Sequence, residues 1–101
     1  MTEDESVRRD LIEIDVSDVS SIHELHQKLA SALGFPDFYG NNWNAFWDAI
    51  TGLVEMPRRL VVHGWHNIIQ RWPNDAKTMA KCLHDLNEQF PTWSCDYELR
   101  G

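Results

Sequence analysis

The sequence predicts a single α/β domain, in which a three-stranded parallel sheet packs with about four helices. Three short stretches have strand character, near residues 11–16, 60–62 and 93–99, and two helical patterns separate each stretch from the next. The middle stretch is a continuous apolar run, typical of a strand that is covered on both faces in a parallel sheet. This order of elements indicates a small α/β fold with right-handed crossovers.

The chain is expected to begin with a loose acidic tail over residues 1–8, followed by one domain over residues 9–101. A chain of 101 residues has the length of one domain. The first strand, rich in β-branched residues, is expected between Asp10 and Asp18.

The first helix is expected to begin at Ser21 and to end at Gly34. Ser21 followed by Glu24 forms a capping-box pattern, and glycine commonly ends a helix. Its apolar side carries Ile22, Leu25, Leu29 and Leu33.

A loop and a short helix follow, and the rest of the chain is organised around them. Phe35-Pro36 opens the loop, and Gly40 is free to take a positive φ angle. Asn42 is a candidate N-cap, because its side-chain oxygen can accept a bond from the next turn. Helical spacing then joins Trp43, Phe46, Trp47 and Ile50, and Thr51-Gly52 is expected to close the helix.

In the second half, residues 65–72 predict a short helix after the apolar strand. Pro73 suits the first turn of a longer helix, which Phe90-Pro91 ends. Apolar and polar residues then alternate from Trp93 to Leu99, which predicts a half-exposed final strand.

Composition excludes several classes of partner. A net charge of −7 argues against nucleic acid and anionic membranes and favours a basic partner. No apolar run approaches the length of a membrane span, and the acidic start lacks a signal peptide, so we expect a cytoplasmic protein. Cys82 and Cys95 are expected to be buried thiols in a reducing cytosol, with a regulatory disulfide as the alternative.

The sequence shows no residue pattern that would support catalysis. The pairs His23/His26 and His63/His66 have no nearby third ligand, so neither a metal nor a cofactor is expected. No nucleophile-and-base pair can be identified.

The short helix has a polar stripe of Asn44, Asp48 and Thr51, with Trp47 at its boundary. No lysine or arginine occurs between Lys28 and Arg58. Asp48 is therefore either a solvated surface acid or the centre of a surface that binds a basic partner. A second base-free stretch, after Lys81, carries Asp85 and Glu88 on one helix face, with the same two interpretations.

The stretch from Gly34 to Asp48, followed by Thr51-Gly52 and Pro57, resembles the signature of the barstar family, which are small intracellular inhibitors of ribonuclease toxins. The matching residues are Pro36, Phe38, Tyr39, Gly40, Asn42, Ala45, Trp47 and Asp48. The chain departs from the family at Asn44, where the motif usually has aspartate, and at Phe38, which is tyrosine in the type member. Length and order of elements also resemble the family over most of the chain.

The resemblance implies an immunity protein that binds a basic ribonuclease toxin in a 1:1 complex and is a monomer when free. Asp48 would occupy the active site of the toxin, and Asp85 would add a second carboxylate. The resemblance places these residues in the interface: Phe38, Tyr39, Gly40, Asn42, Asn44, Trp47, Asp48, Thr51 and Asp85. The alternative is an acidic interaction module for a basic partner that is not a nuclease.

Overall fold

The computed structural model describes residues 8–101, so the predicted acidic tail lies almost wholly outside the described residues. The elements in chain order are β1 (Leu11–Asp15), α1 (Ile22–Leu33), α2 (Trp43–Asp48), the π-helix η2 (Ala49–Leu53), β2 (Arg59–His63), α3 (Trp65–Arg71), α4 (Pro73–Gln89), the 3₁₀ turn η3 (Pro91–Trp93) and β3 (Asp96–Arg100).

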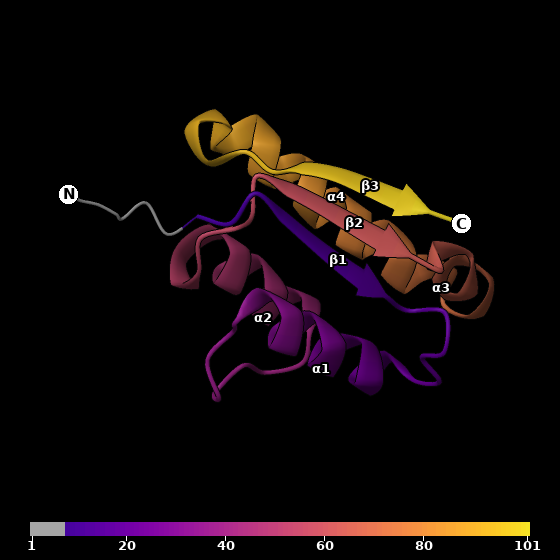
Figure 1. Cartoon of the computed structure of the whole chain (residues 1–101). Coiled ribbons are helices and arrows are strands. Elements are labelled where there is room, and N and C mark those ends of the chain that lie inside the picture. Colours follow the sequence, from indigo (N-terminus) through magenta and orange to yellow (C-terminus); the bar gives the residue numbers. More distant parts are fainter. Residues whose placement is uncertain (1–7) are drawn as a thin grey trace.

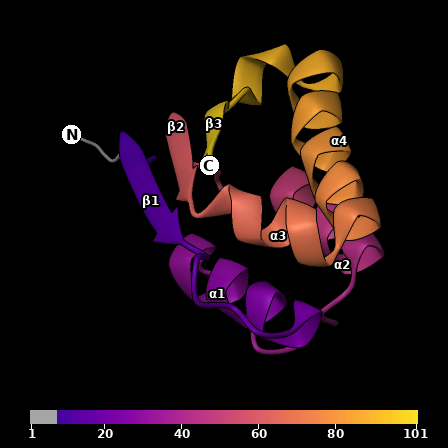
Figure 2. The same ribbon diagram turned by 90° about the vertical axis from the view of Figure 1, so that its right-hand side faces the viewer.

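The three strands form one parallel sheet in the order β1-β2-β3 (Figure 1). The register places Ile12 beside Leu60 and Leu60 beside Tyr97. The helices lie on one side of this sheet (Figure 2). The predicted three-stranded parallel sheet with four α-helices is therefore confirmed.

The central strand β2 is buried on both faces, but by different means. Leu60 and Val62 lie in the core under the helices, whereas Val61 lies outside the core cluster and is still only 3% exposed. Glu13 and Glu98 flank Val61 in the register, and they pair with His63 and Arg59 at 2.7 Å. The second face is thus covered by long polar side chains rather than by a helix.

The predicted helix start at Ser21 is confirmed, with one difference in the capping box. Ser21 Oγ accepts a hydrogen bond from Glu24 N at 3.0 Å. The carboxylate of Glu24, however, accepts bonds from the backbone N and the hydroxyl of Ser20, one residue before the cap. The helix ends as predicted at Gly34, which is left-handed with φ 76°.

The turn after β2 requires glycine at position 64. Gly64 has φ 79°, and a Cβ atom there would lie 2.5 Å from the backbone nitrogen of Ser17. Asn67, in the first turn of α3, donates to the carbonyls of Val16 and Val19 at 2.9 and 3.0 Å. These contacts join the start of α3 to the turn after β1.

The last strand begins later than the alternation predicts. Trp93 ends the turn η3, and β3 begins only at Asp96. Asn87 accounts for the late start, because its side chain bonds the backbone N and O of Cys95 at 2.7 and 2.9 Å. The backbone N–H and C=O of Cys95 are therefore paired with a side chain of α4 and not with the neighbouring strand.

Both cysteines are free thiols, and only one is fully buried. Cys95 lies in the core, where burial raises the pKa of its thiol to about 11. Cys82 is only partly buried, so the prediction of two buried cysteines is half right.

Candidate functional site

The site begins with the loop over residues 35–42, which joins α1 to α2. Tyr39 N donates to Pro36 O at 3.0 Å and closes a turn. The loop has its positive φ angle at Asn41 (53°), and Gly40 does not use the freedom that glycine has there. Asparagine tolerates this region, and a Cβ atom at Gly40 would make a tight contact of 3.2 Å with Nδ2 of the capping residue Asn42.

Tyr39 fastens the loop to α1. Its hydroxyl lies 2.6 Å from Nδ1 of His26, and its ring packs on Phe35 with centroids 4.8 Å apart. Burial raises the pKa of Tyr39 far above its ordinary value. The hydroxyl is therefore engaged inside the fold, and the side chain as a whole is half-buried.

His26 is a structural residue that sequence reasoning missed. Its side chain is 1% exposed, and its Nε2 is buried without a hydrogen-bond partner among residues 8–101. Burial lowers its pKa. The signal was present, because His26 continues the apolar spacing of Ile22, Leu25 and Leu29 along α1.

Trp43 connects α2 to two other helices. Its ring lies 4.3 Å from the His26 ring on α1, and its Nε1 donates to Asp75 Oδ1 on α4 at 2.8 Å. It also meets Phe46, which is fully buried, edge to face. The short helix is thus fixed at its first residue.

Asn42 caps α2 as predicted, since its Oδ1 accepts from Ala45 N at 2.8 Å. The helix does not close at Thr51-Gly52, and this prediction was wrong. It widens instead into η2 and runs to Leu53, with Val54 N bonding Ala49 O at 3.1 Å. Single π turns inside helices are frequent at functional sites.

The solvent side of α2 presents Asn44 and Asp48. Both are exposed, and neither side chain has a hydrogen bond or ion pair within the described part of the chain. Trp47 beside them is half-buried, with its ring 6.5 Å from that of Phe90 at the end of α4. Thr51 donates its hydroxyl to Trp47 O at 2.6 Å, which ties η2 to the preceding turn.

Phe38 stands at the tip of the loop and is 75% exposed, more than any other large apolar side chain of residues 8–101. Solvent-exposed aromatic side chains of this kind are common in surfaces that bind other proteins.

Unpaired carboxylates are concentrated in the two base-free stretches. Elsewhere the acids have partners, for example Asp18 with Lys28 at 3.0 Å and Asp10 with Arg58 at 3.5 Å. Within the described residues, the carboxylates without a hydrogen bond or ion pair are Asp37, Asp48, Glu55, Glu88 and Asp96. Asp48 thus belongs to a part of the surface whose negative charge is not compensated locally.

Asp85 has a different environment from Asp48. It pairs with Lys81 one turn earlier on α4 at 2.7 Å, and this hydrogen bond raises the pKa of Lys81. In the free protein, Lys81 partly neutralises the negative charge of Asp85. The role of Asp85 in binding a partner stays a prediction.

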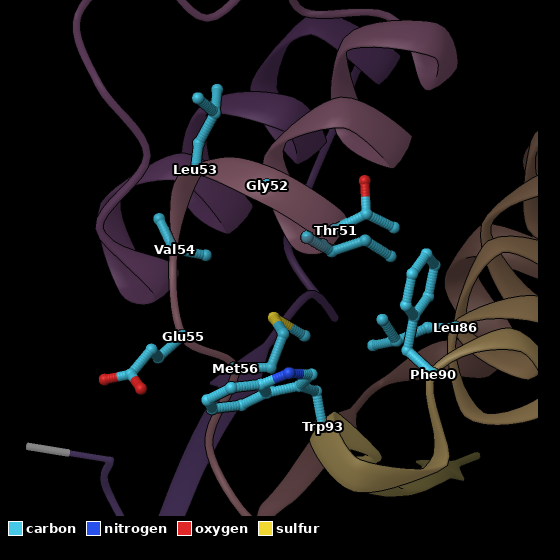
Figure 3. Close-up of a pocket in the computed structure, with 10 residues that line it drawn as sticks. Thr51, Gly52, Leu53, Val54, Glu55, Met56, Leu86, Phe90 and Trp93 are labelled. Carbon is cyan, nitrogen blue, oxygen red and sulfur yellow. The ribbon is translucent and has the colours of Figure 1, made fainter. Parts of the chain in front are cut away.

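A cleft of about 260 Å³ adjoins the helical part of the site (Figure 3). One wall is η2 with the following residues 54–56, and the other is the end of α4 with η3. Leu53, Phe90 and Trp93 line it, and sequence reasoning did not connect them. The available signal was weak, a pair of aromatic residues on either side of Pro91.

Residues 8–101 hold no group of three or more His, Cys, Asp or Glu side chains arranged to bind a metal ion. None of the helices in this range combines the length and apolar content that crossing a membrane requires.

Comparison with known proteins identifies a family and a similar bacterial protein. The family model of Barstar (barnase inhibitor) matches residues 9–98. A Bacillus subtilis (strain 168) protein with the name "Putative ribonuclease inhibitor YrdF" is 47% identical over 81 residues, which is 76% of this chain and 89% of that protein. The matched range contains the loop, α2, η2 and both walls of the cleft.

Proposed function

This chain belongs to the barstar family, and from that premise we propose that it is an immunity protein, which binds and blocks a cytotoxic ribonuclease. It acts in the cytoplasm of the cell that makes the toxin and forms a 1:1 complex. It is a binding protein without catalytic residues or a cofactor.

The observation that carries this proposal is the exposed, unpaired carboxylate of Asp48 on a rigidly anchored helix. A ribonuclease active site uses Arg, Lys and His side chains to hold phosphate. A carboxylate can replace that phosphate, because it accepts short, charge-assisted and often bidentate hydrogen bonds from the same donors.

The neighbouring residues surround this central contact. Phe38 in the loop and Trp47 on α2 supply aromatic surface, and Asn44 offers a neutral amide one helical turn before Asp48. Gly40, Asn42 and Tyr39 keep the loop in one conformation through the contacts described above. Thr51 and Asp85 complete the proposed surface.

The net charge of −7 also favours a fast encounter with a basic nuclease. We expect the association rate constant to fall steeply as salt is raised from about 50 to 500 mM. A flat salt dependence with tight binding would contradict the electrostatic part of this proposal.

The test is the RNA-cleaving activity of the ribonuclease encoded beside this chain's gene, titrated with the wild-type protein and with Asp48→Ala. Stoichiometric loss of activity that the substitution relieves would support an inhibitor acting through α2. Full activity at excess protein would reject the proposal for that nuclease and favour an acidic interaction module with another basic partner.

A further inference from the structure

The cleft beside the site collects apolar side chains that the core leaves in contact with water (Figure 3). Leu53, Phe90 and Trp93 line it with exposures of 48, 39 and 53%. Its floor consists of the buried residues Ile50, Met56 and Leu86. Exposed apolar side chains gathered in a hollow are typical of surfaces that bind another protein.

Arg8 ties the two walls of the cleft together. Its guanidinium donates from Nε to the carbonyl of Met56 at 2.8 Å, in the wall that η2 and residues 54–56 form, and Nη2 lies 3.4 Å from the carbonyl of the next residue, Pro57. On the other side, Nη2 donates to the carbonyl of Ser94, the residue after η3, and lies 3.4 Å from the carbonyl of Trp93, the last residue of η3. The spacing of the walls is therefore set before binding, and a preformed pocket loses less conformational entropy when it is filled.

The cleft is continuous with the proposed inhibitory surface. Thr51 belongs to both, and Phe90 of the cleft lies against Trp47 of α2. At the rim, Glu55 is exposed and has no hydrogen bond or ion pair within residues 8–101. An occupant that fits this hollow is apolar at its tip and carries positive charge beside it.

We propose that the cleft seats one apolar side chain of the same ribonuclease, from a segment in which a lysine or arginine next to that side chain pairs with Glu55. This inference rests on the proposed function, because it assigns the cleft to the partner that Asp48 engages. The two parts of the surface then act differently: Asp48 supplies charge recognition, and the cleft adds an apolar contact that slows dissociation further.

The experiment measures binding kinetics of the ribonuclease encoded beside this chain's gene with the full-length protein. The variants are Leu53→Ala and Trp93→Ala, with Asp48→Ala as the reference for the proposed function. Leu11→Ala is the matched control, because Leu11 has the same 48% exposure as Leu53 but lies on β1, outside the cleft.

We expect each cleft variant to raise Kd by about tenfold or more, through faster dissociation. This increase in Kd should be the same at low and at high salt, because the lost contact is apolar. Leu11→Ala should stay within about twofold of wild type. Circular dichroism and thermal unfolding identify any variant that fails to fold. The test needs only one of the two cleft variants to be folded.

The outcomes separate the two proposals. Wild-type inhibition that Asp48→Ala relieves, with both cleft variants behaving like Leu11→Ala, overturns the cleft assignment alone. Absence of wild-type inhibition overturns the proposed function and the cleft assignment with it. Sedimentation that shows wild-type dimers which Trp93→Ala dissociates would give the cleft to a second copy of this chain and would also overturn the inference.

Discussion

The hydroxyl of Tyr39 and Nδ1 of His26 lie 2.6 Å apart and join the loop before α2 to the interior of α1. The same imidazole packs on Trp43, the first residue of α2. One buried histidine therefore holds both the loop and the helix that present Asp48. The bond requires a neutral imidazole if the hydroxyl is the donor, which makes this anchor sensitive to acid.

Stability should fall in mild acid because of His26. Burial lowers its pKa in the folded protein below the ordinary value of 6.5, so the unfolded chain binds more protons as pH falls through that value. This contribution is complete above about pH 7 and is lost progressively as the pH falls below about 6.5, the pKa of the unfolded imidazole. Urea unfolding across pH 5 to 8 measures the slope.

The variant His26→Gln should be less stable than wild type at pH 8. Its free energy of unfolding should also depend less on pH, because the group that titrates has been removed. His23→Gln, on the exposed side of the same helix, is the control and should keep the pH dependence of wild type. An equal slope in His26→Gln and wild type would mean that another group is responsible.

Removing the cap of α2 should destabilise the protein. Asn42→Ala deletes the acceptor of the Ala45 N–H bond, and loss of such a cap costs about 1 kcal/mol of the free energy of unfolding. Chemical denaturation measures this change. Asn44→Ala is the control, because Asn44 is exposed and makes no hydrogen bond within the described residues, and we expect it to change stability by less than about 0.5 kcal/mol. Equal losses in both variants would argue against the cap as the cause.

Asp48→Ala should weaken inhibition of the cognate ribonuclease by about 100-fold or more. Truncating one partner of a desolvated charge pair costs about 2–5 kcal/mol, since the arginine or lysine opposite is left unpaired. Asp96→Ala is the control: it removes the same charge from another exposed, unpaired carboxylate on β3. If both substitutions weaken inhibition equally, net charge rather than the position of Asp48 determines binding.

Asn44→Asp should tighten inhibition of barnase, the ribonuclease after which the Barstar (barnase inhibitor) family is described. An amide accepts a hydrogen bond but cannot pair as an anion with arginine, so the wild-type chain should inhibit barnase weakly. We expect a gain of about tenfold, measured as the inhibition constant. The control Asn74→Asp adds the same charge at an exposed position of α4. Strong inhibition by the wild type, or no gain in Asn44→Asp, would contradict this prediction.

Local patterns in the sequence were sufficient for most elements of the fold. The Ser21 cap, the left-handed Gly34, the Asn42 cap and Pro73 at the start of α4 are all where the residue types predict them. These signals work because each depends on hydrogen bonds or dihedral angles within a few residues. The continuous apolar run of β2 likewise predicted burial on both faces, because apolar side chains on both sides of a strand need cover from both.

Tertiary structure alone decided which of these residues meet. His26 and Tyr39 are 13 positions apart, and Trp47 meets Phe90 across 43 positions, so no local rule relates them. The cleft exists only because α4, ended by Phe90-Pro91, returns through η3 beside the end of η2. The sequence by itself determined the elements and the unpaired charge of Asp48; packing between distant segments determined how the loop is anchored, where the helix widens and where the apolar cleft lies.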